Sequence, residues 1–491
     1  MEREHLKSRL GFILLSAGCA IGIGNVWKFP YMAGQFGGGA FVLIYLFFLV
    51  VLGIPVMTME FAVGRASQKG ITKMYQQLEP KGTKWHVHGY LALIGNIMLM
   101  MFYTVVSAWM LRYFVDMVSG SLTGVEQQIA QAALENPTAE LVTTEQFFSN
   151  HFGNMLSDPV SLMIYTAIVA FLGFAVCGIG VQKGLEKVTK IMMVALLIIM
   201  VGLAIYGFTL DGAAEGLKFY LVPSFENMKQ AGIFEVIVGA MNQAFFTLSL
   251  GIGSMAIFGS YLKRDRALLG ESINIAVLDT FVALTSGLII FPACFTFGKA
   301  PTAGPPLIFQ TLPEIFNSFP PVLGRILGSF FFLFLTFAAF STVLAVFENI
   351  IAGVMELFNW SRIKTCIIGF FAMFVLCLPC ILGFNVLSNV TFPVLGAGKN
   401  IMDVEDFVVS NVLLPLGSLT FVLFCTLKHR SAWGWENFMN EANQGKGIKV
   451  KKWMCTYMRY VLPVIIVVLF IIGVIPVFKN IIGLITGNIV A

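Results

Sequence analysis

The sequence predicts an all-α protein that crosses a membrane eleven times. Hydrophobic residues make up 57% of the 491 residues, charged residues only 12%, and the mean hydropathy is +0.84. This composition is typical of polytopic membrane proteins and excludes an ordinary soluble domain. Eleven apolar segments are long enough for a spanning helix, which needs about 20 residues. Basic residues gather in alternate loops between them, as expected if every segment crosses.

The apolar segments follow one another with short connections. They lie at 10–34, 40–64, 88–118, 160–180, 188–208, 232–261, 271–298, 323–356, 364–384, 394–426 and 456–479. No small-residue cleavage site follows the first segment, so we interpret it as an uncleaved span rather than a signal peptide. The remaining predicted units are an N-terminus at 1–9, a basic loop at 427–455, and a last unit at 456–491 with span 11 and the C-terminus.

Charge in the loops predicts the orientation. One alternate set is basic throughout: the N-terminus, 65–87, 181–190, 262–270, 357–364 and 427–455. The long loop at 119–159 carries acidic residues and neither lysine nor arginine. The positive-inside rule then places the N-terminus in the cytoplasm, and eleven spans place the C-terminus outside. Short termini and a long external loop without glycosylation sequons favour a bacterial inner membrane.

The first span is interrupted by glycines. Gly18, Gly22 and Gly24 fall within seven residues and are followed by Asn25 and Pro30. Two interpretations are open: a packing face of small residues, or a broken helix whose bare backbone groups bind a ligand. Taken alone, the stretch favours packing.

A second interruption in span 6 changes that balance. Gly251-Ile252-Gly253 echoes Gly22-Ile23-Gly24, and spans 1 and 6 begin on opposite sides of the membrane. Interrupted spans at matching positions predict two inverted repeats, 10–208 and 232–426, with a binding site at the two breaks. Half-helix N-termini suit a carboxylate and half-helix carbonyls suit a cation such as sodium, so a small zwitterion is the expected ligand.

Polar side chains inside the spans support a site of this kind, because burying them is costly. Ionisable residues stand at Glu60, Asp279 and Glu348, and at Asp403, Glu405 and Asp406 at the start of span 10. Hydroxyls stand at Thr247, Ser249, Ser341 and Thr342. A single serine or threonine in a helix more often bonds its own backbone. Cysteines and histidines show no metal-ligand spacing and no nucleophile–base set, so we expect neither an enzyme nor an organic cofactor nor a nucleic-acid partner.

The stretch Arg9–Pro30, the run Gly37-Gly-Gly-Ala-Phe41 and the motif Glu60-x-x-x-Gly64-Arg65 resemble the neurotransmitter:sodium symporter family, particularly its bacterial amino-acid transporters. The similarity extends to about residue 479. The inverted-repeat pattern was itself recognised in transporters of this kind, so it is not independent of the resemblance. The resemblance implies a sodium-coupled symporter that imports a neutral hydrophobic or aromatic amino acid by alternating access, with unknown protein partners. The alternative is a membrane sensor that binds the amino acid with sodium and does not transport it.

The resemblance also implies two sodium sites and one substrate site. The first sodium site is expected at Ala20, Asn25, Thr247 and Asp279, and the second at Gly18, Ile21, Ala338, Ser341 and Thr342. The substrate site is expected at Ala20, Gly22, Gly24, Leu99, Tyr103, Phe246, Ser249, Ile252, Thr342 and Val346. Ile252 stands where some relatives carry phenylalanine, which favours a medium or large side chain.

The resemblance also implies two gates and a pattern of ion dependence. The outer gate is expected from Lys28 with Asp406, and the inner gate from Arg3 with Glu356, supported by Tyr261. Lysine cannot make the bidentate pair of the usual arginine, so we expect a looser or water-mediated outer gate. Asp279 stands where many animal relatives carry asparagine. Its fixed charge predicts transport without chloride, with a proton taken up by Asp279 in the return step as a further hypothesis.

Overall fold

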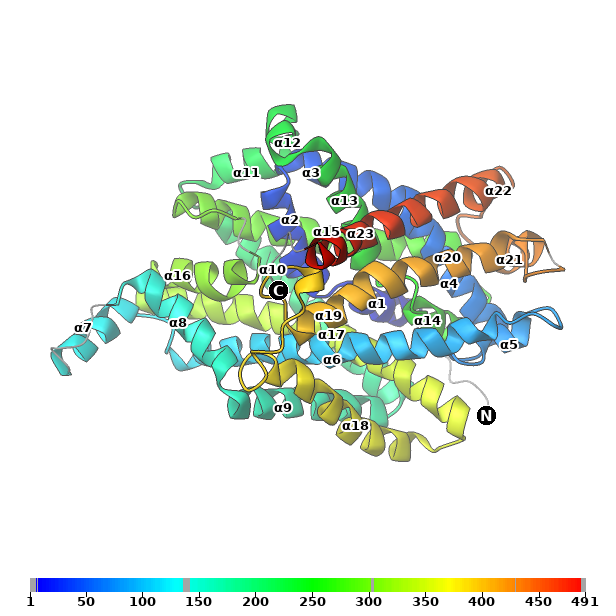
Figure 1. The fold of residues 1–491 in the computed structure, drawn as a ribbon, viewed down its shortest axis with the longest axis horizontal. Helices are drawn as coiled ribbons and strands as arrows, with labels where there is room; N and C mark the ends of the chain where they lie inside the picture. Colours follow the sequence, from blue (N-terminus) through cyan, green and yellow to red (C-terminus); the bar gives the residue numbers. More distant parts are fainter. Residues whose placement is uncertain (1–5, 7, 136–141, 302–303, 429, 487–491) are drawn as a thin grey trace.

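The computed structural model describes residues 6, 8–135, 142–301, 304–428 and 430–486, which fold into a bundle of helices (Figure 1). Within these residues, nine helices are long and apolar enough to cross a membrane without a break. A tenth span is the bent pair α1 (Arg9–Ala20) and Gly24–Gln35, with an angle of 58° between its halves. The segment predicted as span 6 forms two shorter helices, α13 (Ile233–Thr247) and α14 (Ser254–Tyr261), separated by a break. Each of the eleven predicted segments thus corresponds to a helix or to a broken pair of helices.

Several spans contain π-helical turns, labelled η here. The unbroken spans are α3–η2–α4 (Gly39–Phe48, Leu49–Gly53, Ile54–Ser67), α6 (His86–Ser119), α9 (Pro159–Gly178), η3–α10 (Val181–Glu186, Lys187–Gly207), α15 (Leu268–Thr296), α17 (Pro321–Phe358), α18 (Arg362–Leu382), α19–η6–α20 (Ile401–Phe407, Val408–Leu413, Leu414–Thr426) and α22–η7–α23 (Met454–Thr456, Tyr457–Val461, Leu462–Ile485). The second half of the first broken span is η1 (Gly24–Lys28) and α2 (Phe29–Gln35).

Short helices cover the two ends of the bundle. One end carries α5 (Met74–Leu78), α21 (Trp435–Ala442) and the start of span 11 (Figure 1). The other carries α7 (Val125–Glu135), α8 (Thr144–Ser157), α11 (Ala213–Leu221), α12 (Phe225–Ala231) and η4–α16 (Leu307–Thr311, Leu312–Asn317). Helices α7 and α8 lie in the long acidic loop at 119–159, and residues 136–141 between them lie outside the described residues.

Close backbone contact joins the second span to α14, the second half of span 6. A Cβ atom added to Gly64 would collide with the backbone carbonyl of Ala256, and one added to Gly259 would meet the carbonyl of Phe61. Only glycine allows α4 and α14 to approach so closely. The consequence for the site is that Glu60, on α4, lies beside the break in span 6.

Span 10 begins later than the predicted residue 394. The chain forms a 3₁₀ turn, η5, at Pro393–Leu395, and then passes through Gly396 and Gly398 at φ +129° and +71°. These left-handed conformations exclude a continuous helix. The helix starts at Ile401, where Asn400 and Asp403 form a capping box that satisfies free amides.

Candidate functional site

The break in span 1 exposes backbone groups at the middle of the chain's first crossing. Helix α1 ends at Ala20, and Ile21 turns to an extended conformation with ψ 99°. The amide of Ile23 donates to the Tyr103 hydroxyl at 2.9 Å, and the amide of Gly22 donates to Asn25 Oδ1 at 3.2 Å. A Cβ on Gly22 would collide with the Tyr103 hydroxyl and lie 2.6 Å from Thr342 Oγ1. Glycine is therefore required here for close approach of side chains to the backbone.

The break in span 6 is held by a buried carboxylate. Between α13 and α14, Ser249 and Gly251 adopt left-handed conformations at φ +49° and +99°. Glu60, which is fully buried, accepts from the amide of Gly251 at 2.5 Å and from the amide of Met255 at 3.3 Å. Glu60 therefore satisfies backbone amides that the broken helix cannot pair.

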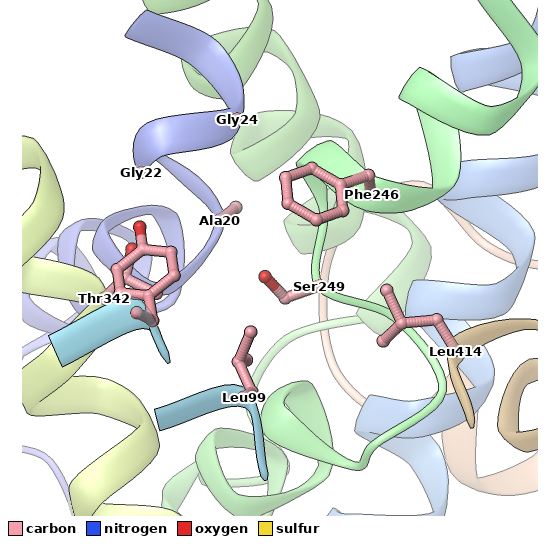
Figure 2. Close-up of a pocket in the computed structure, with 9 residues that line it drawn as sticks. Ala20, Gly22, Gly24, Leu99, Phe246, Ser249, Thr342 and Leu414 are labelled. Atoms are coloured by element: carbon pink, nitrogen blue, oxygen red, sulfur yellow. The ribbon is translucent and has the colours of Figure 1, made fainter. Parts of the chain in front are cut away.

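A narrow cavity of about 20 Å³ lies between the two breaks. Figure 2 shows Phe246 and Ser249 of the span 6 break on one side of it, and Ala20, Gly22 and Gly24 of span 1 on the other. Its lining consists of Ala20, Gly22, Gly24, Leu99, Tyr103, Phe246, Ser249, Thr342 and Leu414.

Most of the residues expected at the substrate site line this cavity, with three differences. Ile252 and Val346 are buried in the core and do not line it. Leu414, at the junction of η6 and α20, lines it and is not among the residues expected there. Leu414 is one apolar residue in a long apolar span, and no sequence signal marks it.

The Asp279 carboxylate accepts hydrogen bonds from two side chains of the broken helices. Asn25 Nδ2 donates to Asp279 Oδ1 at 2.8 Å, and Thr247 Oγ1 donates to Asp279 Oδ2 at 3.1 Å. All three side chains are buried, and they come from η1, α13 and α15. Thr247 bonds a residue of another helix rather than its own backbone. Together with the cavity-lining Ala20, these are the residues expected at the first sodium site.

A second group of oxygens joins span 8 to the end of α1. Thr342 Oγ1 lies 3.3 Å from the carbonyl oxygen of Gly18 and 3.3 Å from that of Ile21. Ser341 Oγ lies 3.4 Å from the Ile21 carbonyl and 2.9 Å from the Ala338 carbonyl. The five residues expected at the second sodium site are therefore gathered in one place, with the carbonyl of Cys19 also 3.4 Å from Thr342 Oγ1.

The two expected gates differ in how far the structure describes them. Lys28 Nζ lies 3.8 Å from the centre of the Phe246 ring. Asp406 accepts from the Ser410 hydroxyl at 2.7 Å, and no Lys28–Asp406 ion pair within 4.0 Å occurs in the described part of the chain. Lys28 thus covers the aromatic ring beside the cavity, which is a cation–π contact.

At the inner end, Arg3 lies outside the described residues. Its expected partner Glu356 accepts from the amide of Gly70 with both carboxylate oxygens, at 2.8 and 2.9 Å. Tyr261 donates to Glu348 at 2.7 Å, and Arg362 forms an ion pair with the same carboxylate at 2.7 Å. This Tyr261–Glu348–Arg362 cluster was not foreseen, because Arg362 stands at the start of span 9 and was interpreted only as a loop charge.

The fold and this arrangement define a class of membrane transporter with two broken helices around a central site. The chain matches the family model described as the sodium:neurotransmitter symporter family over residues 3–482. It is 34% identical over 464 residues to an uncharacterized sodium-dependent transporter, YhdH, of Bacillus subtilis, covering 94% of this chain and 96% of that one. An uncharacterized sodium-dependent transporter of Haemophilus influenzae is 31% identical, covering 96% and 98% of the two chains.

A solved structure also matches this fold. The crystal structure of MhsT in complex with L-phenylalanine matches with a TM-score of 0.81 at 34% identity, covering 96% of this chain and 100% of that one. The chain belongs to the sodium:neurotransmitter symporter family. It is a multi-pass membrane protein of a sodium-dependent transporter family.

Proposed function

We propose that this protein is a sodium-coupled symporter that imports a neutral hydrophobic or aromatic amino acid. The observation that carries the proposal is that two clusters of polar groups, around Asp279 and around Thr342, lie at the two broken helices, and that Ala20 and Thr342 of these clusters line the cavity between the breaks. The L-phenylalanine bound to the related MhsT supports the ligand class. The loop charges support a cytoplasmic N-terminus, and the short termini and the external loop without sequons support a bacterial inner membrane. Import follows from coupling to an inward sodium gradient.

The spacing of the second cluster supports sodium as its occupant. The O···O distances of 3.3–3.4 Å between Thr342 and the α1 carbonyls exceed the ~2.7–2.8 Å usual for a hydroxyl hydrogen bond. Hard cations of sodium's size hold oxygens at about 2.3–2.6 Å, so ligands at right angles stand about 3.3–3.7 Å apart. The oxygens are therefore spaced as the edges of a coordination shell. In this proposal Gly18, Ile21, Ala338, Ser341 and Thr342 are the ligands.

The first cluster supplies charge as well as oxygens. We assign the first sodium to Ala20, Asn25, Thr247 and Asp279, beside the carboxylate of the bound amino acid. Asp279 is buried among helices, and its two oxygens already accept from Asn25 and Thr247. A carboxylate at this position neutralises a second cation without an added anion. This supports transport that does not depend on chloride, with Asp279 free to take up a proton on the return.

The cavity itself suits a zwitterion with an apolar side chain. The Tyr103 hydroxyl accepts from the Ile23 amide, so its own proton is available to donate to a carboxylate. Leu99, Phe246 and Leu414 supply apolar wall. Because the cavity measures only about 20 Å³, these side chains must move apart to admit a side chain of phenylalanine size. Phe246 is half-buried beside Lys28 and is the one best placed to move.

A thermal-shift screen of the twenty amino acids, with sodium and with potassium, tests the proposal. We expect hydrophobic or aromatic amino acids to raise the unfolding temperature only when sodium is present. Asn25→Ala is expected to lose this sodium-dependent shift while the protein still inserts and purifies. Stabilisation of equal size in potassium, or by charged amino acids alone, would contradict the assignment.

A further inference from the structure

A second and larger cavity lies far from the substrate site, at the end of the molecule that carries α21 and the start of span 11 (Figure 1). It measures about 530 Å³. Its lining comes from three segments: the residues that follow α20, the first turn of α21, and span 11 at α22 and η7. The lining residues are Leu427, Lys428, Trp433, Gly434, Trp435, Glu436, Asn437, Cys455 and Arg459.

Two cationic side chains line this cavity without an acidic partner among the described residues. Lys428 is exposed, and no carboxylate of the described chain lies within 4.0 Å of its ammonium group. Arg459 donates from Nε to the carbonyl of Thr426 at 2.7 Å, which fixes the guanidinium and leaves its terminal nitrogens available. A fixed guanidinium beside a mobile ammonium group is a favourable arrangement for a phosphate.

Further basic residues follow α21 in the chain, and Glu436 is the one acidic residue among those that line the cavity. Lys446, Lys449, Lys451 and Lys452 follow α21 in the chain and are exposed. The acidic Glu441 of α21 is already paired with Arg65 at 2.7 Å, so it does not neutralise them. The surface is therefore a strongly basic one at the end that the loop charges predict to face the cytoplasm.

Aromatic side chains place the cavity at the level of lipid head groups. Trp453 and Tyr460, at the start of span 11, are 69% and 63% exposed. Exposed tryptophan and tyrosine at the end of a spanning helix are typical of the membrane–water interface. Arg459 is the neighbour of Tyr460 in η7, so this cation of the cavity belongs to the same helical turn as the exposed tyrosine.

We propose that this cavity binds the head group of an anionic glycerophospholipid, such as phosphatidylglycerol, from the leaflet on that side. Lys428 and Arg459 bind the phosphate. Glu436, on the lining, accepts from the hydroxyl groups of the glycerol head. Basic pockets between membrane helices on the cytoplasmic side are known to hold anionic head groups. Because Arg459 is bonded to the end of span 10, a bound lipid joins spans 10 and 11 to the loop between them.

The test measures binding of short-chain, water-soluble lipids to purified, delipidated protein in neutral detergent. The readout is the unfolding temperature as a function of lipid concentration. Dihexanoyl phosphatidylglycerol is compared with dihexanoyl phosphatidylcholine, which has the same phosphate but no head-group hydroxyls, and with inorganic phosphate. We expect saturable stabilisation by phosphatidylglycerol and little by the other two.

A pair of variants locates the effect. Lys428→Gln is expected to weaken phosphatidylglycerol binding about fivefold, since each cation near anionic lipid contributes about a fivefold factor. Arg430→Gln, which removes an exposed charge two residues away and outside the lining, is the matched control and should bind as the wild type does. Equal binding of the two lipids, an equal effect of inorganic phosphate, or unchanged binding by Lys428→Gln would overturn the proposal. The wild-type comparison stands even if a variant fails to fold.

Discussion

Replacing Thr342 by valine removes one oxygen from the second cluster and keeps the side-chain shape. The Thr342 hydroxyl lies 3.3–3.4 Å from the carbonyls of Gly18, Cys19 and Ile21, so it faces the end of α1 rather than its own helix. Interactions of a neutral group with a charge contribute about 1.5–3 kcal/mol. At 1.4 kcal/mol for each factor of ten, Thr342→Val is expected to need roughly 10 to 150 times more sodium for half-maximal uptake.

The measurement is the sodium dependence of amino-acid uptake into proteoliposomes, with Thr342→Ser as the matched control. Serine keeps the hydroxyl and loses only a methyl group, so its sodium dependence should stay close to that of the wild type. The unfolding temperature of each variant without sodium separates loss of the ion from loss of the fold. A valine variant with wild-type sodium dependence, or a serine variant impaired to the same degree, would refute the coordination role of this hydroxyl.

Three further predictions follow from the contacts of the site. Replacing chloride by gluconate should leave uptake unchanged, because the Asp279 carboxylate supplies the negative charge. A large fall in uptake would contradict this. For the same reason, Asp279→Asn should lose sodium-dependent binding. Glu60→Gln should lower the stability by about 1–3 kcal/mol, measured as a fall in unfolding temperature. The two carboxylate oxygens of Glu60 each accept from a backbone amide, whereas the glutamine side chain has only one oxygen that can accept. Gly64→Ala should strongly lower the unfolding temperature of the protein, since the added Cβ meets the Ala256 backbone. Gly202→Ala is the control, because Gly202 has open space around it. Equal unfolding temperatures of the two variants would disprove the close approach of α4 and α14.

Most of the fold could be predicted from the sequence because two patterns repeat along it. The length of the apolar segments predicts eleven spans, and the alternation of charge between the loops agrees with that number. The glycine pairs at Gly22-x-Gly24 and Gly251-x-Gly253 marked the two helices that the structure shows to be broken. Polar residues within the apolar segments, such as Asp279 and Thr342, indicate a functional site because burying a polar group in a membrane costs free energy. The resemblance then assigned them to clusters, and the structure brings the members of each cluster together.

What escaped prediction depends on contacts between distant segments. Leu414 lines the cavity because span 10 packs beside the break in span 6, and nothing local distinguishes it from its apolar neighbours. Arg362 was grouped with the loop charges, yet it pairs with the buried Glu348 fourteen residues earlier in the chain. Lys28 contacts the Phe246 ring rather than Asp406, and this contact depends on how the two broken helices pack against each other. Periodicity and local composition do not encode such pairings.

The most direct test of the central claim is uptake of a hydrophobic amino acid into proteoliposomes with sodium outside and potassium inside. We predict accumulation above the external concentration, lost when sodium is equal on both sides and the membrane potential is zero. Each sodium ion that enters down a potential of 100 mV contributes about 2.3 kcal/mol, which is enough to drive measurable accumulation. Uptake that does not depend on the sodium gradient, or sodium-dependent binding without exchange across the membrane, would contradict coupling at the two broken helices.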